Sequence, residues 1–428
     1  MECLKCGNEN STDFLFCGSC GTSLILSASN SVVTDQDNSI RYHGLDMLRG
    51  TAMLLGIVLH AALPYVPDIE KFWPADENSS DVISTIFHFI HIWRMPLFFI
   101  LAGFFANLLI SSKSWKSWWQ NRLLRIVLPS IVFAPLMSLT LPWIFKYGRT
   151  GEFIFFYTGE GQPFHLWFLW HLIIFTLVTA ILGPIYLLGV RSLHGLNKIG
   201  LRFILLMLYK SKSIVSSIVF RSRYPLVFII LCCLINARTW GELILNPEAS
   251  GLYFVLGYSL YGNPTLFAHL KTNWSFYLLA AIVGFVAYMI LHLGGFNSIL
   301  NNTSKDGYEI SKTISDLLEL FKYIFRNICA VLFSYAFIGL VENRFGSYNA
   351  KSRFVSDGSY WMYLIHLPIV TLITFLMFKL RIPIEIKFLT AITLTSIICL
   401  VTYKYVVRST FIGILLNGRR YPFRIFGL

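Results

Sequence analysis

The chain has 428 residues, of which 55% are hydrophobic and only 13% carry a charged side chain. Soluble domains average about 25% charged residues, so this composition excludes an ordinary soluble globular protein. Apolar runs of about twenty residues recur along the sequence and are continuous rather than alternating, which is typical of membrane-spanning helices. We therefore predict an all-α polytopic membrane protein.

The first 23 residues differ from the rest because they are polar and rich in cysteine. Cys3 and Cys6 form one Cys-x-x-Cys pair, and Cys17 and Cys20 form a second. Four thiolates presented by two tight turns suit tetrahedral Zn²⁺, so we predict a structural zinc ribbon over residues 1–23. A redox pair or a set of disulfides is the alternative, although disulfides rarely persist in the cytoplasm, where we expect this segment.

Residues 24–40 are rich in Ser, Asn and Asp, which predicts a flexible linker. A membrane domain of about ten helices is predicted for residues 41–410, and a basic tail for residues 411–428. The second apolar run fits one long tilted helix or a helix with a re-entrant end, and the fifth and sixth runs are short. The predicted spans are residues 44–63, 82–110, 123–145, 165–189, 224–237, 250–263, 274–294, 321–342, 359–378 and 386–407.

Basic residues are unevenly distributed among the connecting segments, and this asymmetry predicts the orientation. The segment 64–81 holds five acidic residues and a single lysine, whereas the segments after the second and fourth spans are rich in Lys and Arg. Placing the basic segments in the cytoplasm brings both termini to the cytoplasmic side of a ten-span protein. The net charge of +13 is therefore mostly a topology signal, and no nucleic-acid binding is expected.

Three ionisable residues share one face of the first span. Asp46 lies three residues before Arg49, and His60 lies eleven residues after it. At about 100° per residue, eleven steps end about 20° from their starting direction, and Arg49 and His60 are about 16 Å apart along the helix. A buried Asp or Arg costs roughly 2.5–3.5 kcal/mol in a bilayer and usually faces a functional cavity. The alternative is a local Asp46–Arg49 pair, with His60 capping the helix at the membrane interface.

Further polar clusters occur in the next three spans and in the ninth. They comprise His88, His91 and Arg94 before Pro96 in the second span, Arg122 and Arg125 at the start of the third, His165 and His171 in the fourth, and His366 in the ninth. Because ionisable groups inside a membrane usually face a cavity and mark function, these clusters strengthen a functional interpretation of the first span, and His366 could line the same cavity. An aromatic belt at the interface is the alternative for the fourth span, and a satisfied core histidine is the alternative for the ninth.

These stretches resemble the membrane acyltransferase 3 family. The segment LDMLRGTAMLLGIVLH is similar to the R-x10-H first helix of that family. The segments IHIWRMPLFFILAGFFA, NRLLRIVLP, HLWFLWHLIIF and GSYWMYLIHLPIV follow in the family's order. The resemblance covers about residues 40–410, and the zinc ribbon departs from the family's usual pattern.

The resemblance implies a ten-helix enzyme of the bacterial cytoplasmic membrane. Such an enzyme takes an acyl group from cytoplasmic acyl-CoA and delivers it to a hydroxyl on an extracytoplasmic acceptor, commonly a sugar. The resemblance further implies that His60 and Arg49 are required for activity.

The positions of the basic residues fit such an activity. We expect Arg122 and Arg125, with the nearby Lys116, to bind the anionic coenzyme A at the inner face. The two arginines are favoured over the lysine because a guanidinium contacts phosphate in a bidentate way. The pantetheine arm is then expected to pass Arg49 on its way to His60.

We expect His60 to act as the general base on the acceptor hydroxyl, since histidine has a suitable intrinsic pKa of about 6.5. Arg94 or His91 is the expected donor to the developing oxyanion. Asp46 is expected to orient Arg49 or an arginine of the third span. The acyl group, acetyl or succinyl, stays open, because a succinyl carboxylate needs one further cationic partner.

Two other classes of protein fit the same residues. A transporter or flippase for a glycan precursor also needs intramembrane charges, although such proteins usually show two similar halves. Here the polar clusters concentrate in the first four spans instead. A membrane receptor with the zinc ribbon as its output module leaves the basic residues unexplained. We therefore predict an acyltransferase whose partners are acyl-CoA, a hydroxyl-bearing glycan or similar acceptor, and the lipid bilayer.

Overall fold

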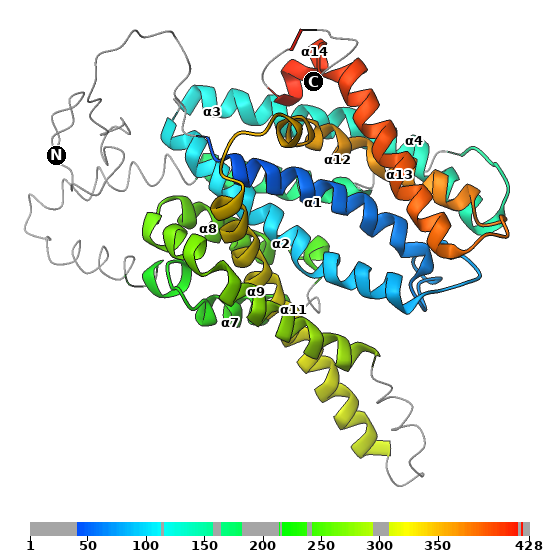
Figure 1. Ribbon diagram of the computed structural model, residues 1–428, viewed down its shortest axis with the longest axis horizontal. Coiled ribbons are helices and arrows are strands. Elements are labelled where there is room, and N and C mark those ends of the chain that lie inside the picture. The colour runs from blue at the N-terminus through cyan, green and yellow to red at the C-terminus, as the bar shows by residue number, and fades with distance from the viewer. Residues whose placement is uncertain are drawn as a thin grey trace, which may run out of the picture.

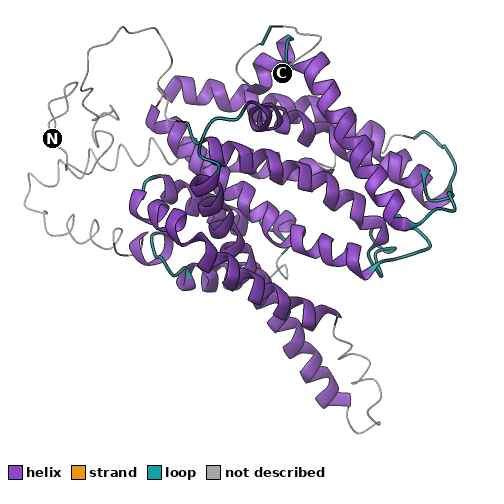
Figure 2. Cartoon of the chain, in the orientation of Figure 1, coloured by secondary structure: helices purple, strands orange, loops and turns teal. Residues whose placement is uncertain are grey.

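The computed structural model describes residues 41–112, 115–156, 164–181, 214, 216–237, 242–293, 308–417 and 421–422. Within them all regular secondary structure is helical, as Figure 2 shows, which agrees with the predicted all-α class. The predicted zinc ligands Cys3, Cys6, Cys17 and Cys20 and the linker 24–40 lie outside the described residues. The zinc ribbon therefore stays a prediction.

The described chain folds into helices joined by loops (Figure 1). The longer helices are α1 (His43–Ala62), α2 (Asp81–Ser112), α4 (Leu128–Thr150), α9 (Pro264–Leu293), α11 (Tyr308–Arg344), α12 (Ala350–Leu376) and α13 (Ile384–Thr402). The shorter ones are α3 (Trp115–Arg122), a helix at Trp167–Ile181, α7 (Leu226–Asn236), α8 (Pro247–Tyr261) and α14 (Phe411–Asn417). Two π-helical segments continue longer helices, namely η2 (Leu123–Val127), which joins α3 to α4, and η7 (Tyr403–Val407), which extends α13.

Seven helical stretches of the described chain are long and apolar enough to cross a membrane. They are His43–Tyr65, Asp81–Ser112, Lys116–Thr150, Pro264–Leu293, Asp316–Arg344, Ala350–Leu376 and Ile384–Val407. Of the two forms predicted for the second span, the single long helix is observed, because α2 continues for 32 residues through Pro96. The protein is thus a multi-pass membrane protein, but the predicted total of about ten spans is not confirmed.

Within the described residues, the other predicted spans correspond to shorter helices. The helices α7 and α8 have 11 and 15 residues, which give about 16 and 22 Å of helix. The apolar core of a bilayer is about 30 Å thick, so neither helix crosses it alone. Each helix buries one face, with Phe228 of α7 and Tyr253 of α8 in the protein core, and exposes apolar side chains such as Ile230 and Val255 on the other.

A helix that begins with polar residues starts earlier in the chain than the apolar run used to predict it. The run predicted for the ninth span begins at residue 359, whereas α12 begins at Ala350. The side chain of Asn349 caps α12 by accepting hydrogen bonds from the amides of Lys351 and Ser352. A search for apolar residues does not detect such a capped polar start.

The helices form two packed groups that meet along α1 (Figure 1). The first group, α2, α7, α8, α9 and α11, shares one apolar core with the beginning of α1. The second group, α4, α12, α13 and α14, shares another core with the end of α1. Within the first group, α9 and α11 run side by side and extend beyond the other helices.

Two glycines allow α2 and α8 to approach each other closely. A Cβ atom at Gly103 of α2 would lie 1.9 Å from the carbonyl oxygen of Phe254, and one at Gly257 of α8 would lie 1.8 Å from that of Ile100. Small residues at a helix contact let two backbones touch, which is a common device of membrane helices. This contact fixes the position of α2, which carries Arg94 and His91.

The loop 66–80, between α1 and α2, is fixed to α13 by a buried ion pair. Lys387 Nζ lies 2.7 Å from Asp76 Oδ2, and the two side chains are only 3% and 1% exposed. Lys387 also donates a hydrogen bond to the carbonyl of Phe378, at 3.2 Å. The loop therefore cannot move away from α13 without leaving a buried charge alone, and it carries Trp73 into the site described below.

We predict that Lys387→Met lowers the thermal unfolding midpoint of the protein in detergent far more than Lys351→Met, a matched change at an exposed lysine. Breaking a buried ion pair typically costs about 3–5 kcal/mol, because the remaining charge is left without a partner. Changing both residues, Lys387→Met with Asp76→Leu, is expected to recover most of the loss. Equal midpoints for the two single variants would contradict this assignment.

Candidate active site

A cavity of about 1020 Å³ has walls from both helix groups. At one end, which we call the arginine end, the lining includes Arg41, Arg49, Arg122, Arg125 and Arg353, with Asp46 and Asp357. At the other end, which we call the histidine end, the lining includes His60, His165 and His366, with Arg94 and Trp73. The helix α1 contributes Arg49 to one end and His60 to the other. These two residues are about 16 Å apart along the helix axis. The stripe predicted on the first span therefore faces one cavity.

Asp46 is the central contact of the arginine end. Its carboxylate lies 2.8 Å from Arg41 Nη2, 3.5 Å from Arg49 Nη2 and 3.3 Å from Arg353 Nη1. Arg353 also pairs with Asp357, with Nε and Oδ2 2.9 Å apart. Asp46 is predicted to orient either Arg49 or an arginine of the third span, and it contacts Arg49. The other partners are Arg41 and Arg353, and neither Arg122 nor Arg125 of the third span contacts it.

Arg49 is held on the side facing α12. Its Nη2 atom donates hydrogen bonds to the carbonyl oxygen and to Oγ of Ser356, both at 3.2 Å. Its guanidinium also lies over the ring of Phe105, 5.9 Å from the ring centroid. These contacts fix the direction of the guanidinium along the cavity wall.

A proline and a π-helical segment expose the backbone beside Arg125. Pro129 has no N–H group, so it cannot make the helical hydrogen bond to the carbonyl of Arg125. The hydroxyl of Tyr360 on α12 donates to that carbonyl instead. Isolated π-helical turns such as η2 often occur at functional sites. Here the segment turns Arg122 and Arg125 into the cavity, whereas Lys116 is exposed on α3 and does not line it.

Three histidine rings from three elements meet at the histidine end. The His366 ring centroid of α12 lies 5.3 Å from that of His60 and 5.2 Å from that of His165. Trp73 also stacks on His60, with centroids 6.1 Å apart and planes inclined by 19°. The His60 ring is therefore packed against an indole and a second imidazole.

Hydrogen bonds fix the tautomers of two of these rings, His366 and His165. His366 Nδ1 lies 2.9 and 3.0 Å from the carbonyl oxygens of Met362 and Tyr363, so it carries the proton and leaves Nε2 with a lone pair. His165 Nε2 donates to the carbonyl of Tyr363 at 2.9 Å, which leaves the lone pair on Nδ1. His366 Nε2, His165 Nδ1 and His60 Nδ1 are buried and make no hydrogen bond within the described residues. Buried nitrogens of this kind are rare, and they suit a bound hydroxyl group.

Arg94 places a positive charge beside these rings. Its side chain crosses α1 at Gly56, where an added Cβ atom would lie only 2.0 Å from Arg94 Nη1. Arg94 is 7% exposed, and its Nε atom is buried without a hydrogen bond. Within the described part of the chain, its guanidinium makes no ion pair with a carboxylate. Such a charge is unfavourable in the unliganded protein and favours an anionic group in the cavity.

The remaining predicted histidines separate into two kinds. His91 lines the cavity, stacks on Phe87 and lies 3.2 Å, through Nε2, from Arg326 Nη2. His88 instead faces α9, where its Nδ1 lies 3.2 Å from the Tyr288 hydroxyl. His171 also faces away from the cavity, because it makes a hydrogen bond to Ser250 of α8. Of the two clusters, His91 and His165 line the cavity, whereas His88 and His171 do not.

Sequence reasoning does not find three further lining residues, Arg353, Tyr363 and Trp73. Arg353 belongs to a polar segment that hydropathy assigns to a loop, and Trp73 belongs to the loop 66–80. Tyr363 offers a weak signal, because it lies one helical turn before His366 and therefore shares its face. Among the described residues, no group of three His, Cys, Asp or Glu side chains is arranged to hold a metal ion.

Comparisons with known proteins identify relatives of the chain. Glucans biosynthesis protein C of Salmonella schwarzengrund (strain CVM19633) is 24% identical over 347 residues, which cover 77% of this chain and 82% of the relative. Proteins of the same name from Shigella dysenteriae serotype 1 and from Escherichia coli (strain K12 / DH10B) are 24% identical over 339 residues, with the same two shares. No solved structure matches the chain.

A wider match covers most of the membrane domain. Residues 42–404 match the sequence profile of an acyltransferase domain. Of the residues named above at the two ends of the cavity, only Arg41 lies outside this range. The chain therefore belongs to the acyltransferase 3 family of membrane enzymes.

Proposed function

We propose that this enzyme is an O-acyltransferase that moves an acetyl or succinyl group from cytoplasmic acyl-CoA to a hydroxyl of an extracytoplasmic glycan or similar acceptor. The main support is the single cavity that contains both the arginine end and the histidine end. The name of the relatives, glucans biosynthesis protein C, supports a glycan as the acceptor.

The arginine end suits the donor. It holds five arginines and two aspartates, so it keeps positive charge after its ion pairs have formed. Coenzyme A carries several phosphate oxygens, and guanidinium groups bind such oxygens through charge-assisted hydrogen bonds. Arg122 and Arg125 bind the phosphates in this proposal, while Lys116 acts only by long-range attraction because it lies outside the cavity. The arginine end and both termini then face the cytoplasm of a bacterial inner membrane.

The histidine end suits the acceptor and the reaction. The acceptor oxygen attacks the thioester carbonyl carbon, and the carbon–sulfur bond breaks as the ester forms. His60 removes the hydroxyl proton and passes it to the departing coenzyme A sulfur, so that the enzyme returns to its starting state. The stacked Trp73 and the neighbouring His366 hold the His60 ring in place.

Arg94 suits the negative charge that develops on the carbonyl oxygen. It is buried, has no carboxylate partner within the described residues and lies among the cavity-lining groups near His60. A fixed cation at that position stabilises the tetrahedral intermediate more than the uncharged thioester. His91, the other predicted donor, is less suited because its Nε2 already accepts a hydrogen bond from Arg326. Arg49 and Asp46 position the coenzyme arm between the two ends.

We predict that His60→Gln lowers acyl transfer about 10²–10⁴-fold, the usual contribution of a general base. The assay follows label from radioactive acetyl-CoA and succinyl-CoA into glycan, in membranes that contain equal amounts of each variant. His88→Gln is the matched control, because His88 is a buried histidine that faces α9. Transfer by His60→Gln at the level of this control would exclude His60 as the base, and the better donor identifies the acyl group.

We predict that Gly56→Ala lowers kcat about 10²–10³-fold while the KM for acyl-CoA changes little. The added methyl group would overlap the guanidinium of Arg94 and displace it, and loss of one oxyanion donor typically has an effect of this size. Gly251→Ala is the control, since a Cβ atom there meets only ordinary contacts with Phe175, the nearest at 3.5 Å. An unchanged kcat in correctly folded Gly56→Ala would show that Arg94 has no part in the chemical step.

A further inference from the structure

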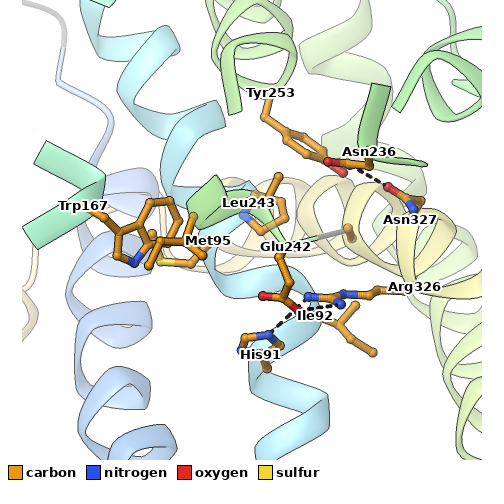
Figure 3. Close-up of a pocket in the computed structure, with 13 residues that line it drawn as sticks. His91, Ile92, Met95, Trp167, Asn236, Glu242, Leu243, Tyr253, Arg326 and Asn327 are labelled. Atoms are coloured by element: carbon orange, nitrogen blue, oxygen red, sulfur yellow. Dashed lines mark hydrogen bonds and ion pairs between the residues drawn. The ribbon is translucent and has the colours of Figure 1, made fainter. Parts of the chain in front are cut away.

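A second cavity, of about 240 Å³, adjoins the first, and we call it the side pocket (Figure 3). It lies among α2, α7, α8, α11 and the segment before α8. Both cavities are lined by His91, Met95, Trp167 and Ile244, so these four residues form the boundary between them. The reaction described above assigns no role to any residue of the side pocket.

The side pocket contains a chain of polar contacts. Arg326 Nη1 lies 3.0 Å from Glu242 Oε1, and Arg326 Nη2 lies 3.2 Å from His91 Nε2. Asn236 Nδ2 also donates to Asn327 Oδ1 at 3.0 Å. Figure 3 shows the charged group and the amide pair among the residues that line the pocket. The two asparagines are 1% and 3% exposed, so their amides are buried polar groups at the pocket wall.

Pro96 provides a further polar group. Pro96 has no N–H, so the carbonyl of Ile92 lacks its usual helical partner. Both residues line the side pocket. In an apolar environment a carbonyl of this kind needs another donor, which a ligand hydroxyl can supply.

The side pocket lies close to Arg94, which has a role in the proposed reaction. His91 precedes Arg94 by three residues on α2, which is less than one helical turn. A group in the side pocket is therefore adjacent to the histidine end of the main cavity. The arginine end, where the coenzyme enters, lies further along α1.

The chemistry of the walls selects among the possible ligands. Burial alone would raise the pKa of Glu242, but the adjacent Arg326 guanidinium outweighs burial and holds that pKa below its usual value. The pocket then has one anionic and one cationic group, already paired, so it offers no extra cation for a succinyl carboxylate or a phosphate. An acyl chain would place apolar groups against the buried amide pair and the ion pair and keep water away from them, which is unfavourable.

A neutral sugar fits the same walls. Each sugar hydroxyl both donates and accepts hydrogen bonds, which matches amides, a carboxylate and a free carbonyl. The flat apolar ring of Trp167 suits the C–H face of a sugar ring. The volume is large enough for one sugar ring and far smaller than the main cavity.

We propose that the side pocket is an acceptor subsite, which holds an uncharged sugar ring next to the ring whose hydroxyl is acylated. This inference rests on the proposed function for its role in the reaction. The binding step itself needs no acyl donor, and it is therefore tested separately.

The test measures equilibrium binding of a radioactive neutral glucose oligosaccharide to the purified full-length protein in detergent, without acyl-CoA. We expect binding by the wild type and at least about tenfold weaker binding by Glu242→Gln, which keeps the shape of the side chain but loses its charge. The double variant Asn236→Leu with Asn327→Leu removes both amides together and should weaken binding to a similar extent. Asn343→Leu is the control, because Asn343 is an exposed asparagine on the same helix, α11.

Three results are decisive. Weaker binding in the pocket variants, with normal binding by Asn343→Leu, supports the subsite. No binding of the neutral oligosaccharide by the wild type, or equal binding by folded pocket variants, overturns it. Specific binding together with no label transfer from either acyl-CoA would support the subsite and contradict the proposed function.

Discussion

Ionisable side chains cannot face lipid at low cost, so the helices that carry them must turn them toward a shared interior. In this protein, α1 brings Asp46, Arg49 and His60 to one wall, and the other helices pack around that wall. The division into two helix groups, with separate apolar cores on either side of α1, follows from this arrangement. The cavity is therefore a consequence of where the polar residues lie along the helices.

The two ends of the cavity differ in how their charged side chains are paired. At the arginine end, Asp46 and Asp357 hold the arginines in fixed positions through ion pairs. At the histidine end, Arg94 has no carboxylate partner within the described residues, and three ring nitrogens make no hydrogen bond there. In the proposed reaction, the first end keeps a stable positive surface for the coenzyme. The second end is completed only when the reacting groups are bound.

The sequence is sufficient to predict the helical class and the shared face of Arg49 and His60. It also predicts that Arg122 and Arg125 lie at the site. It fails where rotation along a helix matters. Residues three apart turn by about 60°, so residues six apart differ by about 120°, and His88 faces α9 while Arg94 faces α1. Arg353 escapes prediction because its contact with Asp46 joins residues 307 positions apart. The number of spans stays a prediction, because seven helical stretches of the described residues are long and apolar enough to cross a membrane.

The central claim is that one cavity connects a donor on one face of the membrane to an acceptor on the other. The most direct measurement uses the purified protein in sealed vesicles sorted by orientation, with labelled acyl-CoA outside and a neutral glucose oligosaccharide enclosed. Our account predicts that the enclosed oligosaccharide becomes labelled only in vesicles whose arginine end faces outward. Labelling that requires donor and acceptor on the same face would contradict it.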